Sequence, residues 1–397
     1  MHARHRFVSG DFALDCRSDG PSDSLDIVPD AAVRRLGAEE SNSAVVVDER
    51  LLLKIYRRIE AGVHPELELG RFLTNVAGFA HTPPLLGSIE HLAEDGSPTA
   101  LAAAFSFVAN QGTGWLWTLD HLDRVLEELR HTPEASRPTP ERVHEFYLNV
   151  VQLLGRRTAE LHMAMAHDSS DPGIAREPVT PADLAAWLME AGDAVIAGCS
   201  ALEPLRTSAE EALAAEIDSV LALRSDIDAM LAEPVTPPAG LAKTRLHGAY
   251  GLGQVIVAKG DIMILGFAGD ANRPLAERRG KGMPFVDLAS MLRSFDHAAW
   301  ASVFRFAESD PVAVDQLLVP ALAWRDLAQA AFMAEYRVVI GGCPSWPDDS
   351  AVADRLLRIF LLRQLFTELA HDALTRPAWL RLSLRGIRQL FAAGTPD

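Results

Sequence analysis

The sequence contains little cysteine and no long apolar run. Its three cysteines are Cys16, Cys199 and Cys343, and they include no C-x-x-C pair and no histidine at ligand spacing. We interpret them as reduced thiols, which excludes a disulfide framework and a zinc site. Apolar stretches such as Leu101–Ala109 are far shorter than the ~20 residues that span a bilayer, and the first residues lack the apolar core of a secretory signal. These absences predict a cytoplasmic protein without a membrane partner.

Basic residues are also scarce relative to acidic ones. The chain has 37 Lys and Arg against 54 Asp and Glu, a formal net charge of −17. Such a surface repels phosphate backbones and anionic lipid unless basic groups gather in one place, and no Lys/Arg run occurs. We therefore exclude nucleic acid as a partner. The length of 397 residues, with 48% hydrophobic and 23% charged residues, predicts a globular protein with more than one subdomain.

The first third of the chain predicts a small sheet with one helix. Residues 1–30 are rich in Asp, Ser, Gly and Pro and indicate a loosely ordered lead-in, a shortened cap region. An N-lobe sheet that could bind nucleotide is then expected over 31–110. Short apolar runs separated by turn residues predict four strands and a helix within it. The strands are expected at 44–47, 51–55, 85–90 and 99–107, and the helix at 66–76.

The remainder predicts a helical lobe that begins after a Gly-bearing connector at Asn110–Trp115. Residues 111–397 form this C-lobe, with an insert at 245–271 that contains two short strands, 253–257 and 262–267. The Ala/Leu/Glu-rich segments predict helices at 119–130, 139–166, 181–197 and 207–232. The fold class is therefore α+β: a protein-kinase-like two-lobed fold with a small β-rich N-lobe and a large helical C-lobe.

The insert holds the most informative motifs. Residues 245–254 read R-L-H-G-A-Y-G-L-G-Q, and residues 262–270 read I-M-I-L-G-F-A-G-D. In kinase-like enzymes a first loop carries an Asp that accepts the proton of the substrate hydroxyl, with a metal-binding amide five positions later. A second loop, after a short strand, supplies an Asp to the magnesium ion. Both loops are present here, but these two acids are absent.

The insert and its surroundings resemble maltokinase, a kinase-like enzyme related to the aminoglycoside phosphotransferases. That family converts ATP and maltose to maltose 1-phosphate, uses Mg²⁺, and often accompanies trehalose synthase. The resemblance covers about residues 31–391 and includes Glu277-Arg278-Arg279 and Met291-Leu292-Arg293-Ser294-Phe295. The positions kept in the two loops are His247, Gly248, Tyr250, Leu252, Gly253, Gln254, Phe267 and Gly269.

The resemblance also implies a nucleotide site in the N-lobe. Ser41, Asn42 and Ser43 fall in the family's nucleotide-covering loop. Lys54 matches the strand lysine that contacts the ATP phosphates, and Glu68 would be its partner on the helix. The implied ligands are ATP, Mg²⁺ and a small sugar such as maltose, and the implied protein partner is trehalose synthase.

The sequence departs from the family at the positions that carry out catalysis. Ala249 replaces the catalytic Asp, and Gly266 replaces the magnesium Asp. Gly251 and Ala268 stand at two further altered positions. Gln254 and Asp270 remain as candidate metal ligands, and for His247 and Asp287 we expect structural roles in the loop.

Two functional interpretations follow from these substitutions. Loss of a positioned general base typically costs about 10²–10⁴ in rate, and loss of metal-borne charge stabilisation costs several kcal/mol more. The first interpretation is a maltokinase-like phosphotransferase that is catalytically impaired. The alternative is a non-catalytic pseudokinase that binds nucleotide or sugar and regulates or scaffolds enzymes of trehalose and glycogen metabolism. A third arrangement, in which Asp270 or Asp287 serves the transfer, is the weakest.

Overall fold

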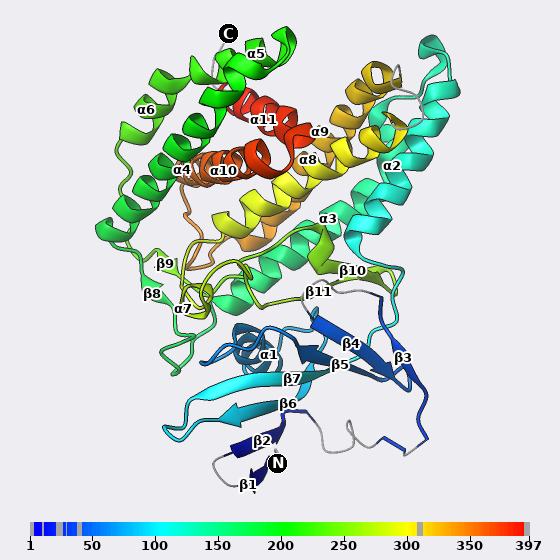
Figure 1. Cartoon of the computed structure of the whole chain (residues 1–397). Helices are drawn as coiled ribbons and strands as arrows, with labels where there is room; N and C mark the ends of the chain where they lie inside the picture. The colour runs from blue at the N-terminus through cyan, green and yellow to red at the C-terminus, as the bar shows by residue number, and fades with distance from the viewer. Residues whose placement is uncertain are drawn as a thin grey trace.

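The computed structural model describes residues 4–9, 12–20, 27–28, 30–37, 42–307 and 313–392. Over these ranges the chain forms two lobes (Figure 1), with the strands of the N-lobe at the bottom of the view and the helices of the C-lobe above them. This arrangement confirms the predicted protein-kinase-like fold class.

The N-lobe is built on one antiparallel sheet of seven strands in the order β1-β2-β6-β7-β5-β4-β3. Two of these strands lie in the segment that we expected to be a loose lead-in. That expectation was wrong because β2 pairs in register with β6 from Ala13 to Ser18. The strands are β1 (Arg4–Ser9), β2 (Phe12–Ser18), β3 (Val33–Arg35), β4 (Asn42–Val47), β5 (Leu51–Tyr56), β6 (Leu85–Leu92) and β7 (Pro98–Ser106).

The hairpin β4–β5 carries the predicted strand lysine. Asp48 and Glu49 both have positive φ, 54° and 49°, which is the conformation of a two-residue type I′ turn, although Asp-Glu is an unusual sequence for it. Helix α1 (Pro65–Asn75) starts with Pro at its first turn and buries Leu67, among other residues, against the sheet. Lys54 on β5 therefore lies beside the start of α1.

The C-lobe is helical apart from short strands. The expected run at 207–232 is two helices, since the chain turns at Ala222–Leu223 between them. The long helices pack in pairs, α3 with α9 and α4 with α10. The helices are α2 (Gly114–His131), α3 (Pro140–Met165), α4 (Pro181–Ser208), α5 (Glu211–Leu221), α6 (Arg224–Ala232), α7 (Leu275–Arg278), α8 (Phe285–Ala307), α9 (Ala313–Ile340), α10 (Ser350–Thr375) and α11 (Leu380–Ala392).

The insert lies at the boundary between the lobes. Its strands β10 (Val255–Ala258) and β11 (Asp261–Ile264) form an antiparallel hairpin, placed between the N-lobe sheet and α3 in Figure 1. The Gly-bearing connector runs along β10, because Gln111 N donates to Val257 O at 2.9 Å. Two further short strands, β8 (Glu177–Pro178) and β9 (Ala242–Lys243), pair with each other. The hairpin thus brings both motif loops to the boundary between the lobes, a region named here the interlobe cleft.

One helix of the described residues passes a length and composition test for a membrane span. It is α4, which contains 28 residues, and 22% of its most apolar window is buried. A single helix of this kind is weak evidence, because packed helices pass the same test. In this structure α4 packs along α10 and α5.

Candidate active-site cleft

Lys54 forms an ion pair with α1, but its partner is Glu66. Lys54 Nζ lies 3.0 Å from Glu66 Oε1, and Tyr56 Oη donates to Glu66 Oε2 at 2.8 Å. Burial would raise the pKa of Glu66, but the charges of Lys54 and His64 and the hydrogen bonds from Lys54 and Tyr56 together outweigh it, so the pKa is below its ordinary value. The predicted pairing with Glu68 was wrong because residues two apart on a helix point about 200° apart. The strand lysine thus has the helix partner that kinase-like sites require.

Glu68 instead ties α1 to the C-lobe. It accepts from Arg279 at 3.0 Å through Nε and 2.5 Å through Nη2, and Arg245 Nη1 binds the same carboxylate. Burial acts to raise the pKa of Glu68, and the hydrogen bonds from Arg279 and Arg245 overcome it, so the pKa is lowered. The carboxylate is therefore ionised and binds two arginines, one at the start of the insert and one at the end of α7.

Asp287 at the start of α8 caps the first motif loop. Its side chain is fully buried and accepts backbone N–H bonds from His247 and Gly248, both at 2.9 Å. His162 Nε2 lies 3.3 Å from the same carboxylate. Burial would raise the pKa of Asp287, but these partners lower it. Asp287 is occupied by the loop backbone and by His162, so its geometry is that of a structural cap.

His247 is enclosed by aromatic rings. Its centroid lies 5.0 Å from that of Tyr250 and 4.9 Å from that of Phe267, and its Nε2 lies 2.7 Å from Leu265 O. Burial lowers the pKa of His247, which keeps the ring neutral. The ring joins the two motif loops and is not presented to a substrate.

The position of the missing magnesium ligand is crowded by Gln254. Gly266 has φ +80°, and a Cβ added there would lie 2.3 Å from Gln254 Oε1. The amide group therefore fills the space beside Gly266 that an acidic side chain would enter. Left-handed backbone of this kind is open to Gly and, less readily, to Asp or Asn.

The remaining candidate ligands do not form a magnesium site. Asp270 accepts from the backbone N–H of Asn272 at 2.9 Å, as in a local turn, and Ala249 and Ala268 offer no side-chain oxygen. Among the residues that the structure describes, no group of three or more His, Cys, Asp or Glu side chains could hold a metal ion. Mg²⁺ takes oxygen ligands, usually one or two carboxylates with substrate phosphates. The residues present do not fit it.

The other predicted positions are distributed around the cleft. Ser41 lies outside the described residues. Asn42 and Ser43 start β4, where they pair in register with Tyr56 and Ile55, so they lie at the same end of the hairpin as Lys54. Gly251 has extended backbone, and a Cβ there would lie 3.2 Å from Ser294 Oγ.

Sequence reasoning missed a second link between the lobes. Arg278 binds Glu60, which follows β5, and Arg58 binds the carbonyl oxygen of Ala271. The Arg278 side chain is only 4% exposed. The signal in the sequence was the Glu277-Arg278-Arg279 segment, but its partners are more than 200 residues away and carry no motif.

The comparisons with known proteins agree with this fold. No family model matches the chain. A glucosamine kinase from Streptacidiphilus jiangxiensis is 26% identical over 357 residues, which cover 89% of this chain and 72% of that protein. A glucosamine kinase from Mycolicibacterium smegmatis is 24% identical over 365 residues, covering 91% and 80%.

A solved structure of glucosamine kinase with glucosamine, ADP and inorganic phosphate has a TM-score of 0.67 and 22% identity, covering 97% of this chain and 83% of that one. This likeness shows a shared protein-kinase-like fold. In sequence the chain is similar to glucosamine kinases, whereas its motifs alone indicate maltokinase.

Proposed function

We propose that this protein is a sugar-kinase relative that binds a nucleotide and a small sugar between its lobes but transfers phosphate very slowly or not at all. The observation that carries the proposal is the intact Lys54–Glu66 pair, 3.0 Å apart, beside loops in which Ala249 and Gly266 replace both acids. The pair is the cationic half of a phosphate site. The two missing acids are the half that would carry out phosphate transfer.

The retained lysine and the missing acids together favour ligand binding over catalytic turnover. A general base contributes about 10²–10⁴ in rate, and nothing at position 249 can accept a proton. Gln254 Oε1 occupies the space beside Gly266, so no carboxylate reaches a divalent cation there. A nucleotide held by Lys54 would consequently bind without Mg²⁺, which ordinary kinases need to bridge the phosphates.

The acceptor is a small sugar, and two candidates have different support. Glucosamine is favoured by the similarity to two glucosamine kinases, and maltose by the motif resemblance. An amino sugar carries a positive charge at neutral pH, and a chain with a net charge of −17 attracts it more than a neutral disaccharide. We therefore place glucosamine first and maltose second.

Calorimetry with ATP, in Mg²⁺ and in EDTA, tests the binding half of the proposal. We expect saturable ATP binding with equal affinity in both buffers, and binding about tenfold weaker in Lys54→Met. The matched control is Lys243→Met, which removes a lysine paired with Asp183 at 2.6 Å outside the cleft. No ATP binding by the unaltered protein would contradict the proposal.

A transfer assay with glucosamine and maltose tests the other half. We expect sugar phosphate to form at no more than the background rate when ATP and Mg²⁺ are present. Metal-dependent turnover of about 1 s⁻¹ or more, the range of ordinary kinases, would refute the impaired site and leave an active sugar kinase.

A further inference from the structure

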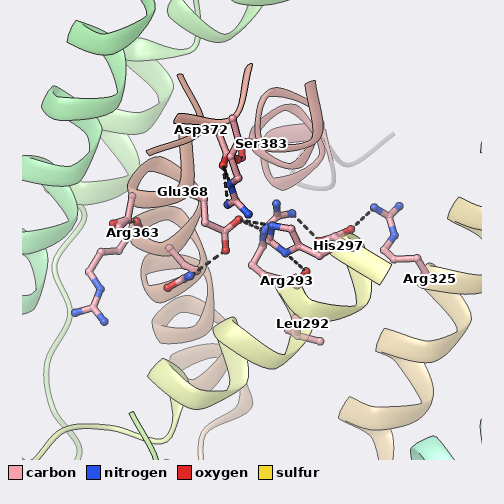
Figure 2. A network of polar contacts seen from close by, with 12 residues as sticks. Leu292, Arg293, His297, Arg325, Arg363, Glu368, Asp372 and Ser383 are labelled. Carbon is pink, nitrogen blue, oxygen red and sulfur yellow. Dashed lines mark hydrogen bonds and ion pairs between the residues drawn. The ribbon is translucent and has the colours of Figure 1, made fainter. Parts of the chain in front are cut away.

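An open cavity of about 510 Å³ lies in the C-lobe between α8, α9, α10 and α11. Figure 2 shows the polar contacts beside it, with Arg293 on α8, Arg325 on α9, and Glu368 on α10, which pairs with Arg293. Its lining includes Arg293, Asp296, Arg325, Gln329, Arg358 and Leu365.

The buried acid of this cavity, Asp296, is already surrounded by donors. It accepts from Arg293 Nη1 and Arg325 Nη1, each at 2.7 Å, and from Gln329 Nε2 at 3.4 Å. Asp296 therefore has little capacity left for a ligand that donates hydrogen bonds. The other acid, Asp326, pairs with Arg325 at 2.7 Å, and its side chain is 66% exposed to solvent.

The basic groups, in contrast, keep unused donors. The side chains of Arg293 and Arg325 are 2% and 5% exposed. Within the described part of the chain, Arg293 Nη2, Arg325 Nε and Arg358 Nε are buried without a hydrogen-bond partner. Buried guanidinium donors without acceptors cost free energy. A ligand that supplied acceptor oxygens to them would remove that cost.

Arg358 has no acidic partner among the described residues. Its Nη2 donates to the carbonyl oxygen of Leu390 at 3.2 Å. It also lines a neighbouring cavity of about 740 Å³, together with Arg388, Asp226 and Glu233. Arg358 is therefore the arginine of this cavity whose charge is least neutralised by a direct partner.

We propose that the cavity between α8, α9, α10 and α11 binds a small organic phosphate. Three arginines and two aspartates line it, and Glu368 balances the remaining charge through its ion pair with Arg293 at 2.8 Å. The site therefore depends on the unused donors of the arginines, whose planar fork matches phosphate oxygens. Leu292, Leu361 and Leu365 form an apolar wall that suits the carbon part of a phosphomonoester. The volume accommodates a molecule of that size and excludes a macromolecule.

This site is distinct from the interlobe cleft. Asp287, which caps the first motif loop, and Arg293 lie on the same helix six residues apart, about 9 Å along its axis. On α10 the cavity is lined by Arg358 and Leu365, whereas Arg363 turns to Glu190 of α4, 2.5 Å away. Phosphate binding here would therefore be independent of Lys54.

Calorimetry with inorganic phosphate and with glycerol 3-phosphate, at constant ionic strength, tests the proposal. Both should bind, and glycerol 3-phosphate should bind more tightly because its carbons contact the leucines. Arg358→Gln should weaken both by about tenfold, the effect of one charge-assisted hydrogen bond. The matched control is Arg337→Gln, which removes a surface arginine paired with Asp354 on α10 and should leave binding unchanged.

A second variant keeps the test decisive if Arg358→Gln does not fold. Arg358→Lys retains the charge but not the fork, and it should weaken binding by a smaller factor. Equal loss in Arg337→Gln would mean non-specific attraction and overturn the proposal. Phosphate binding that disappears in Lys54→Met and persists in Arg358→Gln would place the anion in the cleft and overturn it as well, as would no binding at all.

Discussion

The two sides of the interlobe cleft differ in which functional residues they retain. On the N-lobe side, Lys54 and Glu66 form a buried ion pair, and Tyr56 completes the coordination of the carboxylate. On the C-lobe side, the loops keep their backbone supports in His247 and Asp287. The acids that those loops would present to a ligand are missing.

This difference teaches that scaffold and chemistry are separable in this fold. Asp287 caps the loop through backbone N–H groups, so the loop conformation does not depend on the side chain at position 249. Gly266 and Gln254 fit together without an acid. The loop can therefore lack the reactive groups while its backbone stays in place.

Restoring both acids gives the largest expected change. Ala249→Asp combined with Gly266→Asp should raise sugar phosphorylation above background by about 10²–10⁴-fold. The Gly266 backbone at φ +80° tolerates Asp better than most residues, and the flexible end of Gln254 must move aside. Initial rates with ATP, Mg²⁺ and glucosamine measure the effect.

The matched control for this restoration replaces both positions with Asn. Asn has nearly the same size and the same tolerance of left-handed backbone, but it neither accepts a proton nor carries charge. If the Asn pair gives the same rate as the Asp pair, the carboxylates are not what the site lacks.

Removal of the loop cap gives the next largest effect. Asp287→Ala leaves two backbone N–H groups without their acceptor in a fully buried position, which should lower the free energy of unfolding by about 3 kcal/mol. Urea denaturation measures it. The exposed aspartate Asp354, truncated in the same way, should change stability by less than about 1 kcal/mol. Similar losses in both variants would mean that the cap is not specific.

Much of the fold could be predicted because it follows from local patterns. The hairpin at 44–55, the helix at 66–76 and the strands of the insert all show clear apolar periods. The strands β1 and β2 were missed, since short alternations interrupted by turn residues resemble an irregular segment. Only their pairing with β6 distinguishes them from one.

The site could be predicted only in part, for a geometric reason. The motif spacing located the loops and Lys54, but helix phase decides which acid faces β5, and the sequence did not fix that phase well enough to separate Glu66 from Glu68. Contacts between distant segments, such as Gln254 beside Gly266 or Arg278 with Glu60, depend on tertiary packing.

A smaller effect is expected when the lysine on the N-lobe side of the cleft is replaced. Lys54→Met should weaken ATP binding about tenfold through the loss of a charge-assisted contact to phosphate. It also leaves Glu66 buried without its cation, so Glu66→Gln should be measured beside it to separate stability from affinity. Fluorescence titration with a labelled ATP analogue gives the affinities. An unchanged affinity in Lys54→Met would show that the retained side does not hold the nucleotide.

The smallest expected effect is the pH dependence of stability that arises on the N-lobe side of the cleft. His64 precedes α1 and stacks on Tyr56 with a centroid distance of 4.3 Å. Burial lowers the pKa of His64 to about 4. Because the ordinary pKa is 6.5, the unfolded chain binds the proton first, and stability falls as the pH drops from about 6.5 toward 4. The loss should be about 0.7 kcal/mol between pH 7 and pH 6. His64→Gln should flatten this part of the profile in urea denaturation, and a profile that is equally steep in the variant would place the response in other residues.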